Sequence, residues 1–370
     1  MKHNNKFGAL ALTATFLTAC TLYADTDAQV RNLDHRMQAL EAKRNSCALI
    51  NPPARPTQKC DFGGYLTVDP LLLKPQENGI EFVAKTQLSG LPVLSGNTRA
   101  KTVNFNWDWG FRLGLGANLE HDGWDIFLNW MQFRTHANRF ITPNATETLF
   151  PVLPHPGSVG NEFGNATASA ASSKWKLHLN EIDLEGGRQF FVSKWLTVKP
   201  HAGFRTAWIR QKDHVKYLGL VGPAFPLGKV DMKCNYWGLG IRGGLDTQWG
   251  IACGWSVVAN YAASILYGFF NSHHNEAAIF ASGARSNLFS FKDFYHVGRV
   301  ITDFLIGLRY DYMFCEERYH VGVQAGWEHH MFFGQNQFIR FADDVAQASM
   351  FANQGDLSLQ GFSLDVRFDF

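Results

Sequence analysis

Charged and amide side chains recur at alternate positions along several stretches of this chain, each separated from the next by one residue that is mostly apolar or small. On a β-strand this alternation places all the polar side chains on one face. Turned toward the inside of a closed barrel, that face would line a passage for ions and small hydrophilic solutes. The lining residues predicted in this way are Asn104, Asn106, Asp108, Arg112, Lys199, Arg205, Arg242, Asp246, Asp303, Arg309, Asp311, Gln324, Glu328, Asp365 and Arg367.

Both signs of charge occur among these residues in similar number. Strong cation or anion preference comes from rings of one sign, so we predict a weakly selective lumen. The same charges could instead pair across the barrel and fill it, because barrels of about eight strands are filled by side chains and those of roughly sixteen leave a channel. Two functions therefore stay open: a diffusion pore, or a structural or adhesive barrel with a closed lumen that acts through long external loops.

Residues of the types used by enzymes and metal sites form weaker patterns. The pairs His273-His274 and His329-His330 are adjacent, and neighbouring residues on a strand point to opposite faces. Asp343-Asp344 has no histidine that the sequence places beside it, and a serine-hydrolase elbow of the form GxSxG is lacking. We therefore predict a protein that is not an enzyme and that uses no metal and no cofactor.

The composition indicates a folded protein that is partly in contact with a non-aqueous medium. Of the 370 residues, 46% are hydrophobic and 14% aromatic, which is enough for a large core and excludes a disordered chain. Charged residues make up 18%, below the ~25% typical of soluble domains. The 31 Phe and 34 Gly fit strands in which aromatic and small residues alternate better than they fit helical bundles.

Residues 1–24 have the layout of a secretory signal peptide. Lys2 and Lys6 precede the largely apolar Phe7–Tyr23, and Ala24 is a small residue suited to cleavage. Lipidation at Cys20 is the alternative, and the apolar run is short of the ~20 residues that a spanning helix needs. Cleavage would remove two lysines and leave equal numbers of basic and acidic residues, which argues against nucleic acid as a partner.

Residues 25–60 are predicted to form a short helix and a loop. Cys47 and Cys60 bracket a polar, proline-containing segment that can bend back on itself, so either a disulfide in an exported protein or two free thiols would fit. The helix either joins copies of the chain, as in a homotrimer, or is a lone amphipathic helix. The residues at coiled-coil a/d spacing are Val30, Leu33, Met37 and Leu40.

Residues 61–370 are predicted to form an all-β fold, a transmembrane antiparallel β-barrel of about ten strands, with about twelve to sixteen left open. The clearest strand is Val103–Leu119, where every odd residue is apolar. Short connections alternate with long ones, as the periplasmic turns and external loops of outer-membrane barrels do. The short ones are predicted at 120–123, 186–194, 248–254 and 315–318, and the long ones near 75–102, 136–174, 212–231, 269–296 and 334–356.

Four longer stretches resemble a known family. They are 73–80 (LKPQENGI), 187–209 (GRQFFVSKWLTVKPHAGFRTAWI), 326–338 (GWEHHMFFGQNQF) and 357–370 (LSLQGFSLDVRFDF). They are similar to the major outer membrane proteins of the Legionella-type and chlamydia-like pore-forming family. The resemblance implies a β-barrel porin that is abundant in the outer membrane and often oligomeric or disulfide-linked. Arg210-Gln211 depart from the acidic residue more usual there, so the resemblance implies nothing about charge selectivity.

The chain ends on an amphipathic strand whose last residue is Phe370. Such an ending resembles the signal read by the outer-membrane assembly machinery. The predicted location is therefore the outer membrane of a Gram-negative-type bacterium, with membrane lipid, the assembly machinery and small hydrophilic solutes and ions as partners.

Overall fold

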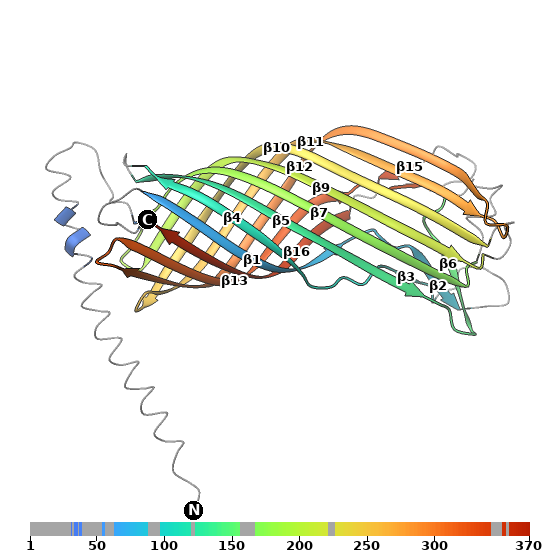
Figure 1. The fold of residues 1–370 in the computed structure, drawn as a ribbon, viewed down its shortest axis with the longest axis horizontal. Coiled ribbons are helices and arrows are strands. Elements are labelled where there is room, and N and C mark those ends of the chain that lie inside the picture. Colours follow the sequence, from blue (N-terminus) through green and yellow to red (C-terminus); the bar gives the residue numbers. More distant parts are fainter. Residues whose placement is uncertain are drawn as a thin grey trace, which may run out of the picture.

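The computed structural model describes residues 31, 33–35, 37–38, 54–55, 63–87, 97–119, 123–155, 167–220, 226–341, 350–352 and 355–370. Most of them lie in long strands wound into one barrel (Figure 1). The barrel strands are β1 (Gly64–Glu77), β4 (Asp108–Asn118), β5 (Trp124–Ile141), β7 (Ala170–Arg188), β9 (Leu196–Leu218), β10 (Leu227–Ala252), β11 (Trp255–Ile279), β12 (Arg285–Phe314), β13 (Tyr319–Asn336) and β16 (Gly355–Asp369).

The ten strands form a closed antiparallel ring. Each pairs with its neighbour in sequence order, β16 pairs with both β13 and β1, and β9 pairs with β10 to leave no free edge. The two-residue strand β8 (Phe190–Phe191) adds only a short pairing with β9. At the closure, Gly64 and Phe370 exchange backbone hydrogen bonds of 3.2 and 3.0 Å. The predicted ten-stranded barrel is confirmed.

The connections at one end of the barrel are short, as predicted. β10 and β11 are joined by Cys253 and Gly254 alone, and Gly254 has a φ of 82°, which glycine adopts without strain. Segments of two smaller sheets lie toward the opposite end (Figure 1). They are β2 (Val83–Gln87), β3 (Arg99–Lys101) and β6 (Glu147–Pro151) in one, and β14 (Ile339–Phe341) and β15 (Met350–Ala352) in the other.

Two of the predicted long connections are wrong. The segment predicted as a loop at 269–296 is mostly strand, because β11 continues to Ile279 and β12 begins at Arg285. Likewise β9 and β10 extend into the predicted loop at 212–231. The reason is visible in β9, where Phe204 faces outward but Ile209 faces inward. The apolar residues lie on the outward face in the first part of the strand and on the inward face in the second part. A pattern with apolar residues on one constant face therefore ends before the strand does.

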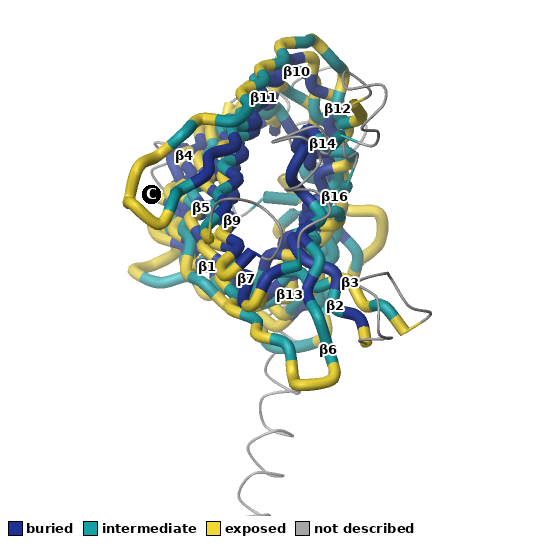
Figure 2. Tube along the Cα trace, turned by 90° about the vertical axis from the view of Figure 1, so that its right-hand side faces the viewer, coloured by how far each residue is buried: buried dark blue, intermediate teal, exposed yellow. Residues whose placement is uncertain are grey.

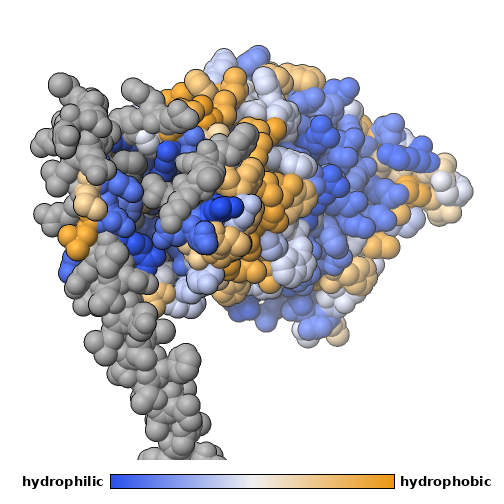
Figure 3. Space-filling model, turned by 60° about the vertical axis from the view of Figure 1, so that its left-hand side comes forward, coloured by the Kyte–Doolittle hydropathy of each residue, from blue (hydrophilic) through white to orange (hydrophobic). Residues whose placement is uncertain are grey.

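This change of sides divides the barrel into two parts. In the membrane-crossing half, which comprises the strand segments next to the short turns, apolar side chains point outward; examples are Trp109, 69% exposed, and Ile241, 63% exposed. In the outer half, which comprises the segments beyond, the outward side chains are polar and the inward ones apolar, as with Trp175 and Leu177. Figure 3 shows an apolar band across the barrel with hydrophilic side chains beyond it.

The main hydrophobic core lies inside the outer half. Inward side chains such as Phe133 and Phe270 contact residues from connecting segments, including Phe82, Leu149 and Phe338, in one buried cluster. Figure 2 views the ring of strands from this end, with buried residues along its inner side. The outer half therefore has the inside-apolar arrangement of a water-soluble protein, and the membrane-crossing half has the reverse.

Near the N-terminus the described residues between 31 and 38 are helical, with Leu33 63% and Met37 58% exposed. The ring of His35 lies 6.1 Å from that of Phe191, which places this helix beside the short turns. Among the described residues, no helix is long and apolar enough to cross a membrane. The predictions for the signal peptide, Cys20, Val30, Leu40, Cys47, Cys60 and Asp343-Asp344 concern residues outside the described ones.

Candidate functional site: the charged interior

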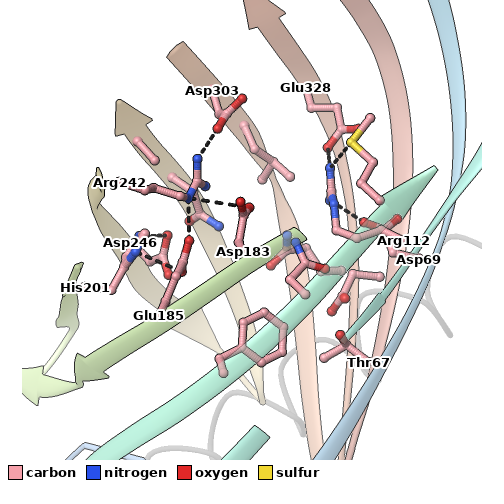
Figure 4. Close-up of a pocket in the computed structure, with 18 of the residues that line it drawn as sticks. Thr67, Asp69, Arg112, Asp183, Glu185, His201, Arg242, Asp246, Asp303 and Glu328 are labelled. Carbon is pink, nitrogen blue, oxygen red and sulfur yellow. Dashed lines mark hydrogen bonds and ion pairs between the residues drawn. The ribbon is translucent and has the colours of Figure 1, made fainter. Parts of the chain in front are cut away.

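The inward side chains of the membrane-crossing half surround a cavity of about 230 Å³. Strands from all around the ring contribute, because in each one every second residue points inward. Acidic and basic side chains meet there in a connected network, part of which is drawn in Figure 4. The charged lining residues are Asp69, Arg112, Glu181, Asp183, Glu185, Lys199, His201, Arg205, Arg242, Asp246, Asp303, Arg309, Glu328, His330, Asp365 and Arg367.

Two arginines form the centre of the network. Arg205 of β9 donates two hydrogen bonds of 2.7 Å to Asp183 of β7 and lies 2.8 Å from Asp303 of β12. Arg242 of β10 contacts Asp303 and Glu185 and lies 3.7 Å from Asp183 (Figure 4). The two guanidinium groups thus hold carboxylates from strands on both sides of them, and the Arg205–Asp183 pair has the bidentate geometry that arginine favours.

A second cluster lies around Arg112 of β4. Its guanidinium is 2.5 Å from Asp69 of β1 and 3.0 Å from Glu328 of β13 (Figure 4). His330, also on β13, joins this cluster to the central one, since its Nδ1 is 2.7 Å from Asp303 and its Nε2 is 3.3 Å from Glu328. Contacts across the lumen therefore link strands that are not neighbours in the ring.

Toward the short turns the network continues through Asp125. This carboxylate lies 2.5 Å from Nζ of Lys199 and accepts a hydrogen bond of 2.7 Å from the hydroxyl of Tyr65. The guanidinium carbon of Arg367 lies 3.8 Å from the centre of the Tyr65 ring, within the range of a cation–π contact. Arg367 also pairs with Asp369 at 2.6 Å, so this end of the lumen is also lined by paired charges.

Most of the predicted lining residues do face the lumen. All of them except Asn104, Asn106, Asp108 and Asp311 line the cavity. Asp108 still points inward, where Thr135 donates to it at 2.6 Å, and Asp311 pairs with Arg309 at 2.8 Å and His320 at 3.0 Å. The inward face of the membrane-crossing strands was thus readable from alternation alone.

The predictions for Asn104 and Asn106 are wrong, because both side chains are exposed. β4 begins only at Asp108, so the single strand predicted over Val103–Leu119 does not form as one unit. Val103 is buried in the core of the outer half, and the ring of Phe105 packs edge-on against Trp175 at 5.3 Å. Val103 and Phe105 turn inward, which sends the two asparagines outward.

Several lining residues were missed by the sequence reasoning. Glu181, Asp183 and Glu185 alternate with Ile182 and Leu184, a signal that was present in the sequence. Asp69 and His201 had no partner nearby in sequence, and only the ring brings them, and His330 with its contact to Asp303, to charges on other strands. His329 and His330 point to opposite faces as expected, and the part of the chain that the structure describes contains no group of three or more His, Cys, Asp or Glu that could hold a metal.

Above the cavity, connecting segments lie inside the barrel. The inward Tyr217 of β9 donates to the carbonyl of Phe82 at 2.5 Å, and on the other side Ser272 of β11 donates to the carbonyl of Gln337 at 3.0 Å. Arg340 joins the two segments by donating to the carbonyl of Gly79 at 2.7 Å. Segments 79–83 and 336–341, which we call the inner bar, therefore occupy the lumen of the outer half.

Two carboxyl groups lie within the apolar surroundings of the outer half. Gln211 donates to Glu77 at 2.5 Å, and Ser173 donates to Asp213 at 2.7 Å. Burial raises the pKa of Glu77 to about 8 and that of Asp213 to about 6, because few charges nearby compensate for lost hydration. This contrasts with the carboxylates of the cavity, most of which have basic partners.

Residues 55–370 match the family described as "Legionella pneumophila major outer membrane protein precursor". A search of curated proteins found no match. Similar solved structures include the outer membrane protease OmpT from Escherichia coli (TM-score 0.41, 10% identity, covering 84% of this chain and 97% of that one). Another is a Pseudomonas aeruginosa FadL homologue (TM-score 0.28, 12% identity, covering 83% and 90%).

The family match extends over all the barrel strands, and the ring of ten antiparallel strands carries the apolar outer band that a membrane barrel needs. The protein is therefore an outer-membrane β-barrel. From its match over residues 55–370, the chain belongs to the family of the Legionella pneumophila major outer membrane protein.

Proposed function

We propose that the protein is a narrow, weakly selective outer-membrane pore for ions and small hydrophilic solutes, with the inner bar closing the lumen at rest. The observation that carries the proposal is the polar cavity at membrane level, with basic and acidic side chains distributed around its wall. An apolar filling would close a barrel at least as stably, because buried ion pairs contribute little net stability. A lumen rich in paired charges is therefore better explained by passage of water and ions.

The pairing of the charges also predicts how the pore selects. No single sign dominates the wall: Arg205 and Arg242 face Asp183 and Asp303 at the same level. A permeating cation and a permeating anion would each meet a partner there, so neither is excluded. The proposal involves no catalytic step.

The test is single-channel conductance of the folded protein in a planar bilayer, with the reversal potential measured under a KCl gradient. Heat-modifiable gel migration first establishes that the barrel has formed. Discrete steps with a reversal potential near zero are expected. A strongly shifted reversal potential would contradict weak selectivity, and a barrel that never conducts would contradict the pore itself.

A variant of the inner bar sharpens this test. Arg340→Gln removes the hydrogen bonds from Arg340 to Gly79 and Glu81 that join the two segments, so open events should become more frequent. Arg318→Gln is the matched control, because Arg318 is exposed in the short turn between β12 and β13, at the opposite end of the barrel from the inner bar. Equal open probability in the two variants would remove the inner bar as the closing element.

A second candidate function is a structural or adhesive barrel with a permanently closed lumen. The observation in its favour is the density of the outer half, where Phe82 and Phe338 of the inner bar are 0% and 1% exposed. Such a protein would act through its outer surface. Silence of both the folded wild type and Arg340→Gln in the bilayer would favour this function over the pore.

A further inference from the structure

The outward wall of the outer half carries an unusual row of basic side chains. Strand register places His136, Lys176, Lys212, Lys233, His273 and Lys292 directly opposite one another across the adjacent strands β5, β7, β9, β10, β11 and β12. We call these six residues the basic row. All six side chains lie on the outward side of their strands, because the residues directly before and after each of them in sequence point inward.

Such a row is unfavourable for the protein alone. Like charges directly opposite each other on adjacent strands destabilise a sheet. The six residues form no ion pair within the described part of the chain. At the next outward position on either side of each of them, the single acidic residue among the described ones is Asp231. That carboxylate is already held by His214 at 2.6 Å. The described part of the chain therefore holds no charge that balances the row, and a bound anion would supply it.

The nearby histidines report the same local excess of positive charge. The pKa of His178 is lowered by partial burial and then by four basic neighbours, Arg134, Lys212, Lys176 and Arg210. The pKa of His273 is lowered by partial burial and then by Lys292 and Lys233. An anion placed among these side chains would therefore be attracted by several of them at once.

The position of the row identifies the kind of anion. On β9 the next outward residue from Arg210 toward the short turns is Trp208. Trp208 lies opposite Trp237 on β10, and Trp237 lies opposite Phe269 on β11. These aromatic residues begin the apolar band, where lipid chains lie. A lipid whose acyl chains contact this band would place its headgroup at the basic row. The opposite wall lacks the feature, since Lys74 on β1 faces Gln360.

We propose that the basic row binds the phosphate groups of phosphorylated lipids in the outer leaflet, whose acyl chains lie against the apolar band below. Lysine ammonium groups act as point charges toward phosphate, and several of them are needed to hold a doubly charged headgroup. A soluble polyanion could use the basic row but would gain nothing from the aromatic residues beneath it. The charge and the adjoining apolar surface together therefore favour lipid.

The experiment uses the full-length folded protein in detergent and probes it with bis-phosphorylated lipid A and with the same lipid after dephosphorylation. Native mass spectrometry counts the retained lipid. The wild type should retain the phosphorylated form at least tenfold more, and added salt should reduce the preference because the contact is electrostatic. The triple variant Lys176→Gln/Lys212→Gln/Lys233→Gln should lose it, whereas Lys74→Gln on the opposite wall should keep it.

A second readout covers the case in which neutralisation alters the barrel itself. In detergent without phosphorylated lipid the triple variant should be at least as heat-stable as the wild type, because repulsion within the row is relieved. Phosphorylated lipid A should then raise the melting temperature of the wild type only. Equal lipid retention by the triple variant would overturn the proposal, as would tighter binding of heparin than of phosphorylated lipid A.

Discussion

The two halves of this barrel share their strands but are built in opposite senses. In β9 the outward Phe204 and the inward Arg205 of the membrane-crossing half give way, within a few residues, to the inward Ile209 and the outward Arg210 of the outer half. Nothing in the backbone changes between them, because the ladder with β10 runs without interruption from Leu196 to Leu218. The medium around the barrel determines which side of a strand is apolar: the outward side where the barrel is in lipid, and the inward side where it is in water.

The comparison also shows two ways of filling a lumen. The membrane-crossing half contains ion pairs around a cavity, and the outer half contains a packed apolar core with the inner bar through it. Packed apolar groups exclude water without partners, whereas each buried charge depends on another. The polar half should therefore be sensitive to the loss of single partners, and the apolar half to the loss of volume.

The largest expected effect is from Asp303→Ala in the membrane-crossing half. This carboxylate contacts Arg205, Arg242 and His330, so its removal takes one negative partner from three buried basic groups at once. The loss in free energy of unfolding should be about 3–5 kcal/mol. Urea unfolding in lipid vesicles measures it, with Asp246→Ala, whose side chain is 38% exposed, as the milder control. Equal effects of the two variants would contradict the dependence on pairing.

Phe133→Ala tests the outer half in the corresponding way. The side chain is 0% exposed in the apolar core, so truncation should leave a cavity and cost about 3 kcal/mol or more. Phe140→Ala is the control on the same strand, because Phe140 is 65% exposed and should contribute little. The same unfolding experiment applies. If both substitutions were neutral, the outer half would not be a packed core.

A smaller, pH-dependent effect should come from Glu77. Its pKa is raised from 4.5 to about 8 in the folded protein, so the folded state binds the proton more tightly than the unfolded state. Stability from this group is full below pH 4.5 and falls as the pH rises toward 8, by up to about 1.4 kcal/mol per unit. Glu77→Gln should remove this part of the slope, and Glu316→Gln at an exposed turn should not. A slope unchanged by Glu77→Gln would place the titration elsewhere.

The smallest effect on either half is expected from the N-terminal helix. Leu33→Asp/Met37→Asp replaces two exposed apolar residues outside the barrel, so barrel stability should not change. If the helix joins copies of the chain as the heptad spacing predicts, light scattering should show a smaller assembly. An unchanged mass would mean a lone helix.

Alternation within the sequence determined the membrane-crossing strands, the closed ring of ten and most of the charged lining, because a strand between lipid and a polar lumen must repeat with a period of two. Arg112, Lys199 and Arg367 were found in this way without any knowledge of their partners. The alternatives for Cys47 and Cys60, a disulfide or two free thiols, stay predictions, as does the assembly role of Phe370.

The tertiary structure alone decided the rest. Asn104 and Asn106 point outward because Val103 and Phe105 are drawn into a core formed by strands distant in sequence. The ion pairs of Asp303 join β9, β10 and β13, and the inner bar joins segments more than 250 residues apart. Alternation shows that the two sides of a strand face different surroundings. It does not show how far the membrane extends along the strand, and it does not show which charges the closed ring brings together.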